Sequence, residues 1–241
     1  MGIYLNPDNE GFKESVHSEI YVDKTGLIKY TNELMNTEQK YICVSRPRRF
    51  GKSMALKMLA AYYSCGCDSR ELFRGRKIEK NDSFEEHLNQ YDVIYLNMQQ
   101  FLIRARKQEV TEYLEHVVIA DIRKVYGGLF AEDETILAAA LEQIYSETGR
   151  KFVFLIDEWD CVMRERQEYE EMQRVYLNFL RDLIKDQPYV ALAYMTGILP
   201  VKKYGEHSAL NMFTEYSMTD QYAFEEYTGF TEDEVKELCG R

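Results

Sequence analysis

The chain has 241 residues, with 30 basic and 41 acidic side chains and a formal net charge of −11. This length suits one large domain, or one domain with part of a second. The excess of negative charge disfavours nucleic-acid binding through the overall electrostatic field, so we expect no direct DNA binding by this segment. No apolar run approaches the roughly 20 residues that span a bilayer, so we expect no membrane association.

The N-terminus and the cysteines indicate the compartment. The N-terminal stretch MGIYLNPDNEGF has neither a basic region nor an apolar core, so a secretory signal is not expected. The five cysteines show no disulfide-framework spacing, and Cys65 and Cys67 have no second Cys or His pair at zinc spacing. Free thiols in a reducing cytoplasm are the expectation.

Short apolar strands alternate with helical segments along the chain. Apolar runs predict strands over 41–44, 93–96, 152–156, 189–195 and 214–218. Helical periodicity with stop signals predicts helices over 53–64, 109–126, 134–148 and 170–185. Continuous apolar strands between helices indicate an α/β fold with a parallel sheet covered on both faces. In such sheets ligands bind beyond the carboxyl ends of the strands.

A phosphate-binding loop is predicted after the first strand. Residues 45–53 read SRPRRFGKS, and Gly51-Lys52-Ser53 matches the end of a Walker A motif. Gly51 allows close backbone approach, the helix N-terminus presents N–H groups to phosphate, Lys52 adds a charge, and the Ser53 hydroxyl suits Mg²⁺. The alternative is a surface loop in which three residues coincide by chance; the strand before and the helix after favour the functional interpretation.

The loop departs from the general motif at one position, because Arg46 stands where the first glycine would fall. Arg48 and Arg49 add further positive charge beside the loop. The residues predicted to contact the nucleotide are Arg46, Arg48, Arg49, Phe50, Gly51, Lys52, Ser53 and Met54.

An acidic partner motif follows the third predicted strand. Residues 152–158 read FVFLIDE, which is typical of a Walker B strand. Asp157 would hold Mg²⁺ with Ser53, and Glu158 would activate the attacking water. A glutamate directly after the aspartate indicates the additional-strand class of P-loop ATPases. The alternative is a strand that ends in solvated acids, and the upstream loop argues against it.

Three further residues near these motifs have two interpretations each. Trp159 either approaches the nucleotide or packs over the strand end, and we favour packing. Asp160 fits a supporting carboxylate or a solvated loop acid equally well. Thr196, at the end of the next strand, is predicted to sense the γ-phosphate and is the third predicted catalytic residue beside Lys52 and Glu158; the alternative is a turn cap before Gly197. Arg164 and Arg166 have no spacing that marks an arginine finger.

Several segments together resemble the AAA-ATPase-like family. Residues 45–53 resemble its R-P-R-R-F-G-K-S signature, which makes Arg46 the family's own variant, and residues 155–160 are similar to its I-D-E-aromatic-D motif. Further similar stretches are 21–25 (YVDKT), 196–200 (TGILP), 210–215 (LNMFTE) and 227–231 (YTGFT). The resemblance implies a P-loop ATPase domain of the AAA-like class, often followed by a helical lid and a PD-(D/E)XK nuclease-like domain.

The expected organisation is a P-loop ATPase domain over residues 1–225 and the start of a truncated helical lid over 226–241. Thr231 and Glu234 form a capping box that opens this last helix. The expected activity is hydrolysis of ATP with Mg²⁺. The alternative is a nucleotide-gated switch with negligible turnover that controls an attached or separate nuclease-like domain, since a lid often supplies the transition-state arginine.

Overall fold

The structure is a computed structural model that describes residues 2–106, 109–201, 209–218, 224 and 226–240. Its centre is a five-stranded sheet in the order β2-β3-β4-β1-β5, and all the paired strands run parallel. The strands are β1 (Tyr41–Ser45), β2 (Asp92–Asn97), β3 (Phe152–Asp157), β4 (Val190–Gly197) and β5 (Thr214–Tyr216). The predicted α/β fold is confirmed.

The strand order places β4 between the strand that precedes the phosphate loop and the strand that ends in acids. β4 pairs with β1 on one side and with β3 on the other. The inserted strand is the arrangement expected from the additional-strand class of P-loop proteins. Consequently the carboxyl ends of β1, β4 and β3 lie side by side.

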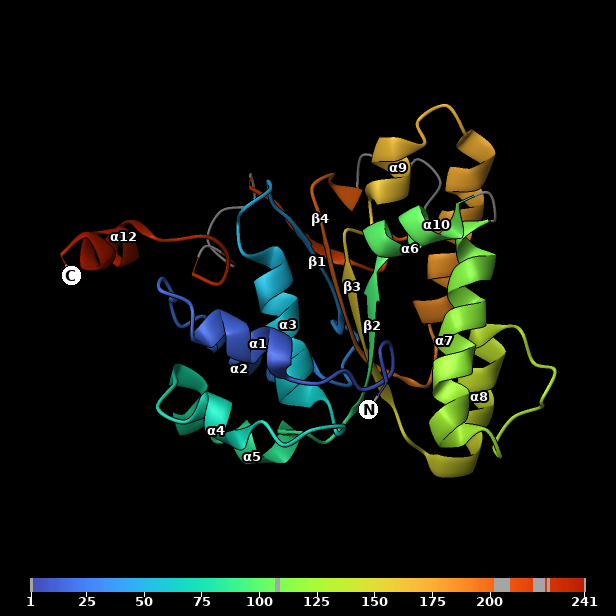
Figure 1. The fold of residues 1–241 in the computed structure, drawn as a ribbon, viewed down its shortest axis with the longest axis horizontal. Helices are drawn as coiled ribbons and strands as arrows, with labels where there is room; N and C mark the ends of the chain where they lie inside the picture. Colours follow the sequence, from blue (N-terminus) through green and yellow to red (C-terminus); the bar gives the residue numbers. More distant parts are fainter. Residues whose placement is uncertain (1, 107–108, 202–208, 219–223, 225, 241) are drawn as a thin grey trace.

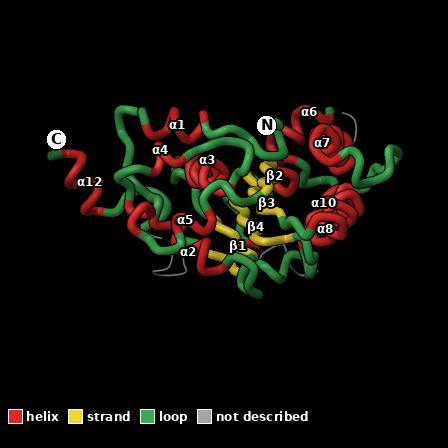
Figure 2. The backbone as a smooth tube through the Cα atoms, turned by 90° about the horizontal axis from the view of Figure 1, so that it is seen from below, coloured by secondary structure: helices red, strands yellow, loops and turns green. Residues whose placement is uncertain are grey.

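Helices cover both faces of the sheet (Figures 1 and 2). One layer contains α1 (Glu10–Val16), α2 (Gly26–Leu34), α3 (Lys52–Tyr63), α4 (Arg70–Phe73), a 3₁₀ turn (Lys77–Lys80) and α5 (Phe84–His87). The other layer contains α7 (Val110–Tyr126), α8 (Leu137–Thr148) and α10 (Glu170–Ile184). Two short helices, α6 (Met98–Ala105) and α9 (Cys161–Glu165), follow the carboxyl ends of β2 and β3, and α12 (Glu232–Cys239) lies out beyond the α1–α3 side.

Alternate residues of a strand belong to two separate hydrophobic cores, one on each face of the sheet. In β3, Phe152, Phe154 and Ile156 pack toward the α7–α8–α10 layer, whereas Val153 and Leu155 pack toward the α1–α3 layer. All five side chains are fully buried. Because side chains alternate across a strand and both faces are covered, the strand reads as a continuous apolar run.

The predicted elements all correspond to observed ones, with small shifts at their ends. α8 begins at Leu137 and not at residue 134, and β5 ends at Tyr216 and not at residue 218. The sequence patterns did not predict α1, α2, α4, α5, α6 or α9. Within the described residues, no helix is both long and apolar enough to cross a membrane.

Candidate nucleotide site

The loop after β1 ends on the N-terminus of α3. Gly51 is the N-cap of this helix with φ of 73°, in the left-handed region that glycine adopts most easily. No side chain caps this N-terminus, so the N–H groups of the first turn face the loop. A helix N-terminus of this kind attracts an anion through its dipole and its N–H donors.

Lys52 points back into the phosphate loop. Its Nζ donates to the carbonyl oxygens of Arg46 and Pro47, each at 2.9 Å, and the residue is only 7% exposed. Burial lowers the pKa of Lys52, and the charges of Glu158 and Asp157 oppose this shift. The loop therefore closes around the ammonium group and holds it beside the helix N-terminus.

Asp157 joins three elements at the edge of the sheet. Its two oxygens accept hydrogen bonds from the Ser53 hydroxyl of α3 and the Thr196 hydroxyl of β4, both at 2.6 Å. Asp157 is 1% exposed and Thr196 is fully buried. Because each hydroxyl uses its proton on the carboxylate, the carboxylate orientation is fixed from both sides.

The donor set at this point fits a magnesium ion. Ser53 and Asp157 present hydroxyl and carboxylate oxygens, the hard ligands that Mg²⁺ prefers. In the described parts of the chain, no group of three or more His, Cys, Asp or Glu side chains could hold a metal. A magnesium ion here would therefore need further oxygen ligands from phosphate and water, as is usual when it is bound together with a nucleotide.

Glu158 is held by a residue that the sequence analysis did not select. Its backbone lies in the left-handed region with φ of 55°, and its Oε2 accepts a hydrogen bond from the guanidinium of Arg164. Arg164 also donates through Nε to the buried Asp160 at 3.1 Å. Asp160 and Arg164 are four residues apart, and this spacing is the sequence feature from which their ion pair could have been predicted. Trp159 is fully buried over the strand end, in line with the packing interpretation.

The other loop residues divide into two groups. Arg46 is 3% exposed, and its guanidinium donates to the Thr228 hydroxyl and the Tyr216 carbonyl, each at 3.3 Å. These contacts connect the loop to the end of β5 and to the segment that follows it, and the predicted contact of Arg46 with phosphate stays a prediction. Arg48 and Arg49 are exposed at the loop surface.

A mostly apolar cavity of about 170 Å³ lies beside the phosphate loop. Its lining includes Arg49, Gly51 and Met54 of the predicted nucleotide-binding residues. The remaining lining comes from α1, the segment 20–24, α3 and residues 227–230: Phe12, Ile20, Tyr21, Val22, Lys24, Ala55, Met58, Tyr227, Gly229 and Phe230. Next to it, the Phe50 carbonyl accepts a hydrogen bond from the Gly229 N–H at 3.0 Å.

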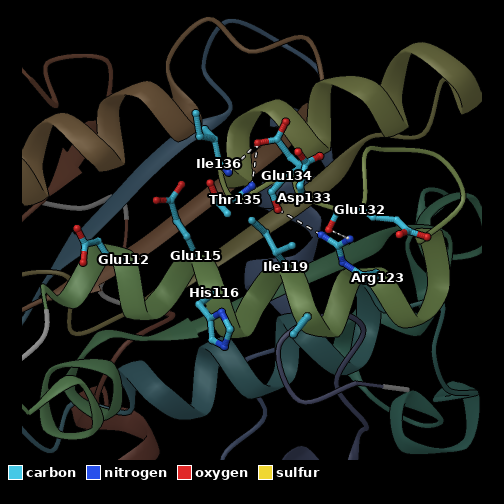
Figure 3. A pocket seen from close by; sticks show the side chains of 11 residues that line it. Glu112, Glu115, His116, Ile119, Arg123, Glu132, Asp133, Glu134, Thr135 and Ile136 are labelled. Atoms are coloured by element: carbon cyan, nitrogen blue, oxygen red, sulfur yellow. Dashed lines mark hydrogen bonds between the residues drawn. The ribbon is translucent and has the colours of Figure 1, made fainter.

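A larger cavity of about 580 Å³ lies on the opposite face of the sheet, between α7 and residues 132–136 (Figure 3). Its rim carries the acids Glu112, Glu115, Glu132, Asp133 and Glu134. Arg123 also lines it, but its guanidinium donates to the Glu132 and Glu134 carbonyls. This negative surface repels phosphate, so volume alone does not locate the nucleotide site.

Comparison with known proteins identifies the family. A family profile described as Predicted AAA-ATPase matches residues 11–205. The chain belongs to this AAA-ATPase-like family. The match covers the phosphate loop, Asp157, Glu158 and Thr196, and it supports nucleotide binding as the general property of this AAA-ATPase-like chain.

A relative from Azotobacter chroococcum mcd 1, described as "Uncharacterized protein in vnfD 5'region", is 26% identical over 219 residues. The alignment covers 89% of this AAA-ATPase-like chain but 40% of the relative. The chain therefore spans about two fifths of the length of that protein, and the description of the relative assigns it no activity.

Proposed function

We propose that this AAA-ATPase-like chain binds ATP with Mg²⁺ and hydrolyses it to ADP and phosphate. The observation that carries the proposal is the contact of Asp157 with Ser53 and Thr196, directly beside the N-terminus of α3. These side chains come from three separate elements, and their meeting at the carboxyl edge of a parallel sheet is what a nucleotide site requires.

Each side chain has a separate part in the proposal. The α3 N-terminus and Lys52 bind the phosphates, with Lys52 exchanging its loop carbonyls for phosphate oxygens. Ser53 and Asp157 hold the magnesium ion, which would neutralise phosphate charge. Glu158 orients the attacking water and accepts its proton. Thr196 acts through Asp157, so it senses the metal-bound phosphate indirectly.

The cavity beside the loop is the proposed site of the nucleobase. Its lining is mostly apolar and includes the aromatic rings of Phe12, Tyr21, Tyr227 and Phe230. Flat aromatic surfaces favour stacking with a base, and Gly51 of the phosphate loop also lines this cavity, so base and phosphates would lie next to each other.

A nucleotide-gated switch is the second candidate. Two contacts favour it, because Arg46 bonds to Thr228 and the Phe50 carbonyl bonds to the Gly229 N–H. In this candidate, occupancy of the loop moves Thr228 and Gly229 and whatever they contact, including the nuclease-like domain that the family resemblance suggests. Turnover distinguishes the candidates: a switch would bind ATP with negligible hydrolysis.

Thermal unfolding with and without ATP and Mg²⁺ tests binding. A ligand about 100-fold above its Kd stabilises a fold by roughly 2.7 kcal/mol. For a chain of this size that corresponds to a Tm rise of about 5–10 °C. Lys52→Ala should lose most of the rise, because the fixed charge at the phosphates is gone.

Lys57→Ala is the matched control, since Lys57 lies on the same helix but is exposed. It should keep the Tm rise of the parent chain. A parent chain whose Tm does not respond to ATP and Mg²⁺ would refute nucleotide binding.

A further inference from the structure

Arg164 lies between two carboxylates at the carboxyl end of β3. Its guanidinium donates to Glu158 Oε2 and, through Nε, to Asp160 Oδ2. The side chain of Arg164 is 15% exposed, that of Glu158 is 25% exposed and that of Asp160 is fully buried. Burial alone would lower the pKa of Arg164, but the charges of Asp160 and Glu158 outweigh it and raise the pKa. The guanidinium therefore stays charged in this position.

The position of Arg164 is fixed by the segment that follows β4. Asp160 Oδ2 also accepts hydrogen bonds from the N–H groups of Ile198 and Leu199, at 3.0 and 2.8 Å. The Arg164 N–H donates to the Asp160 carbonyl at 3.0 Å, which anchors α9 to the same residue. Asp160 therefore holds both the backbone N–H and the guanidinium of Arg164, and Asp160 is itself held by the backbone after β4. From this fixed position Arg164 contacts Glu158.

Glu158 needs such support because its backbone lies in an uncommon conformation. A φ of 55° is rare for a residue with a Cβ atom and costs of order 1–2 kcal/mol. Its neighbours hold it there, since Trp159 N–H donates to the Thr196 carbonyl and Cys161 N–H donates to the Glu158 carbonyl, both at 3.0 Å. The Glu158 side chain has several rotatable bonds, so its carboxylate can occupy many positions. A general base acts only from within hydrogen-bond reach of the attacking water, so another residue has to hold the carboxylate there.

We propose that Arg164 is a positioning residue for ATP hydrolysis: it holds Oε2 of Glu158 so that Oε1 faces the attacking water. This inference rests on the function proposed above. Because both of its contacts are carboxylates of the protein, Arg164 is assigned to the base and not to the phosphate.

Single-turnover hydrolysis by Arg164→Ala, together with ATP affinity, tests this assignment. Loss of the contact should lower the hydrolysis rate by about 10²-fold, the cost of misplacing a reacting group. ATP affinity should stay within about twofold of the parent value, because the residue does not touch phosphate. Arg164→Lys should recover part of the rate, since an ammonium group can still bond to one carboxylate.

A double-mutant cycle separates positioning from a general structural effect. If Arg164 acts through Glu158, adding Arg164→Ala to Glu158→Gln should cost little further rate, whereas independent effects would multiply. Arg166→Ala is the matched control from the same segment and should keep the parent rate. Should the alanine variant fail to fold, Arg164→Met carries the same expectations, because its side chain keeps much of the volume but has no hydrogen-bond donor.

Parent-like or faster hydrolysis by Arg164→Ala with intact ATP affinity would overturn the inference, and so would multiplicative losses in the double variant. Either result leaves the proposed function standing if Lys52→Ala still loses binding. A parent chain with no hydrolysis would refute the proposed activity and this inference together.

Discussion

Asp157 shows how the chemistry of one side chain depends on residues far from it in sequence. Its two hydroxyl partners, Ser53 and Thr196, are 104 and 39 residues away. The sequence motifs predicted all three residues as part of one site. They could not predict that Lys52 bonds to two loop carbonyls or that Arg46 turns toward Thr228, because those contacts depend on how the loop closes.

Asp157→Asn should remove most of the magnesium dependence of ATP binding. The amide keeps the shape of the carboxylate but loses its charge and one acceptor. We expect the ratio of ATP affinities with Mg²⁺ and with EDTA to fall by about 10–100-fold, which is the range typical of substitutions around other metal sites. Calorimetric titration in both buffers measures that ratio. Asp133→Asn removes an exposed acid elsewhere and should leave it unchanged; an unaltered ratio in Asp157→Asn would exclude Asp157 as a metal ligand.

At the scale of elements, the sequence predicted the long helices, the buried strands and the start of α12, but not the other short helices. α6 begins at Met98, directly after β2 ends at Asn97, and no turn residue separates the two elements. The Asn97 side chain marks the helix start, because it accepts from the Gln100 N–H at 3.0 Å. α9 has five residues, too few to show periodicity. The Asp-Glu pair indicated the additional-strand class, but the order of the strands was not predicted, because periodicity does not report which strands are neighbours.

Gly197 sets how closely β4 approaches the segment after β3. A Cβ atom there would lie 2.5 Å from Trp159 Nε1 and 3.0 Å from Asp160 Oδ1. Gly197→Ala should therefore destabilise the fold by about 1–3 kcal/mol through overpacking, and it should also slow hydrolysis by shifting the Asp160 support. Denaturant unfolding measures the stability change. Gly128→Ala is the control, because a Cβ at that position meets nothing within 4 Å. Equal stability of the two variants would contradict the prediction, since it would mean that Trp159 and Asp160 move aside at no cost.

On the scale of the whole molecule, segments near the two ends of the chain meet beside the phosphate loop. Lys24 is 5% exposed, and its Nζ donates to both Glu234 oxygens at 2.7 Å and to the Glu226 carbonyl at 2.8 Å. The neighbouring Asp23 accepts from the Lys77 N–H at 2.8 Å. The segment 21–25, identified in the sequence only by family resemblance, thus connects α12 to the body of the protein and lines the proposed base cavity.

The Lys24–Glu234 pair should make stability depend on pH. Burial alone would raise the pKa of Glu234, but hydrogen bonds from Lys24 and from the Thr231 N–H outweigh it and lower the pKa below the ordinary value of 4.5. The stabilisation is therefore present above about pH 4.5 and is lost as the pH falls through the lowered pKa. Glu234→Gln keeps the capping acceptor and removes the charge, so it should cost about 1–3 kcal/mol at pH 7.

The difference between Glu234→Gln and the parent chain should shrink as unfolding is measured at progressively lower pH. Glu232→Gln, which breaks an exposed pair with Lys236 on the same helix, should change stability by less than about 1 kcal/mol. A Glu234→Gln deficit that stays constant down to acid pH would mean that the ion pair does not stabilise the fold.

The most direct test of the proposed function is single-turnover hydrolysis of ATP with Mg²⁺ and the protein in excess. Because Arg164 contacts two carboxylates of the protein, we do not assign it to the transferred phosphate. An arginine that stabilises the transition state is worth about 10³–10⁵ in rate, and the site proposed from the described residues is without this contribution. We therefore expect slow, first-order phosphate release by the parent chain, well below the typical enzyme rate of about 10 s⁻¹. Glu158→Gln should bind ATP equally well and release phosphate at least about 100-fold more slowly, while Glu168→Gln, an exposed acid nearby, should match the parent. Phosphate release at the same rate by Glu158→Gln and the parent chain, or none by the parent, would contradict this account.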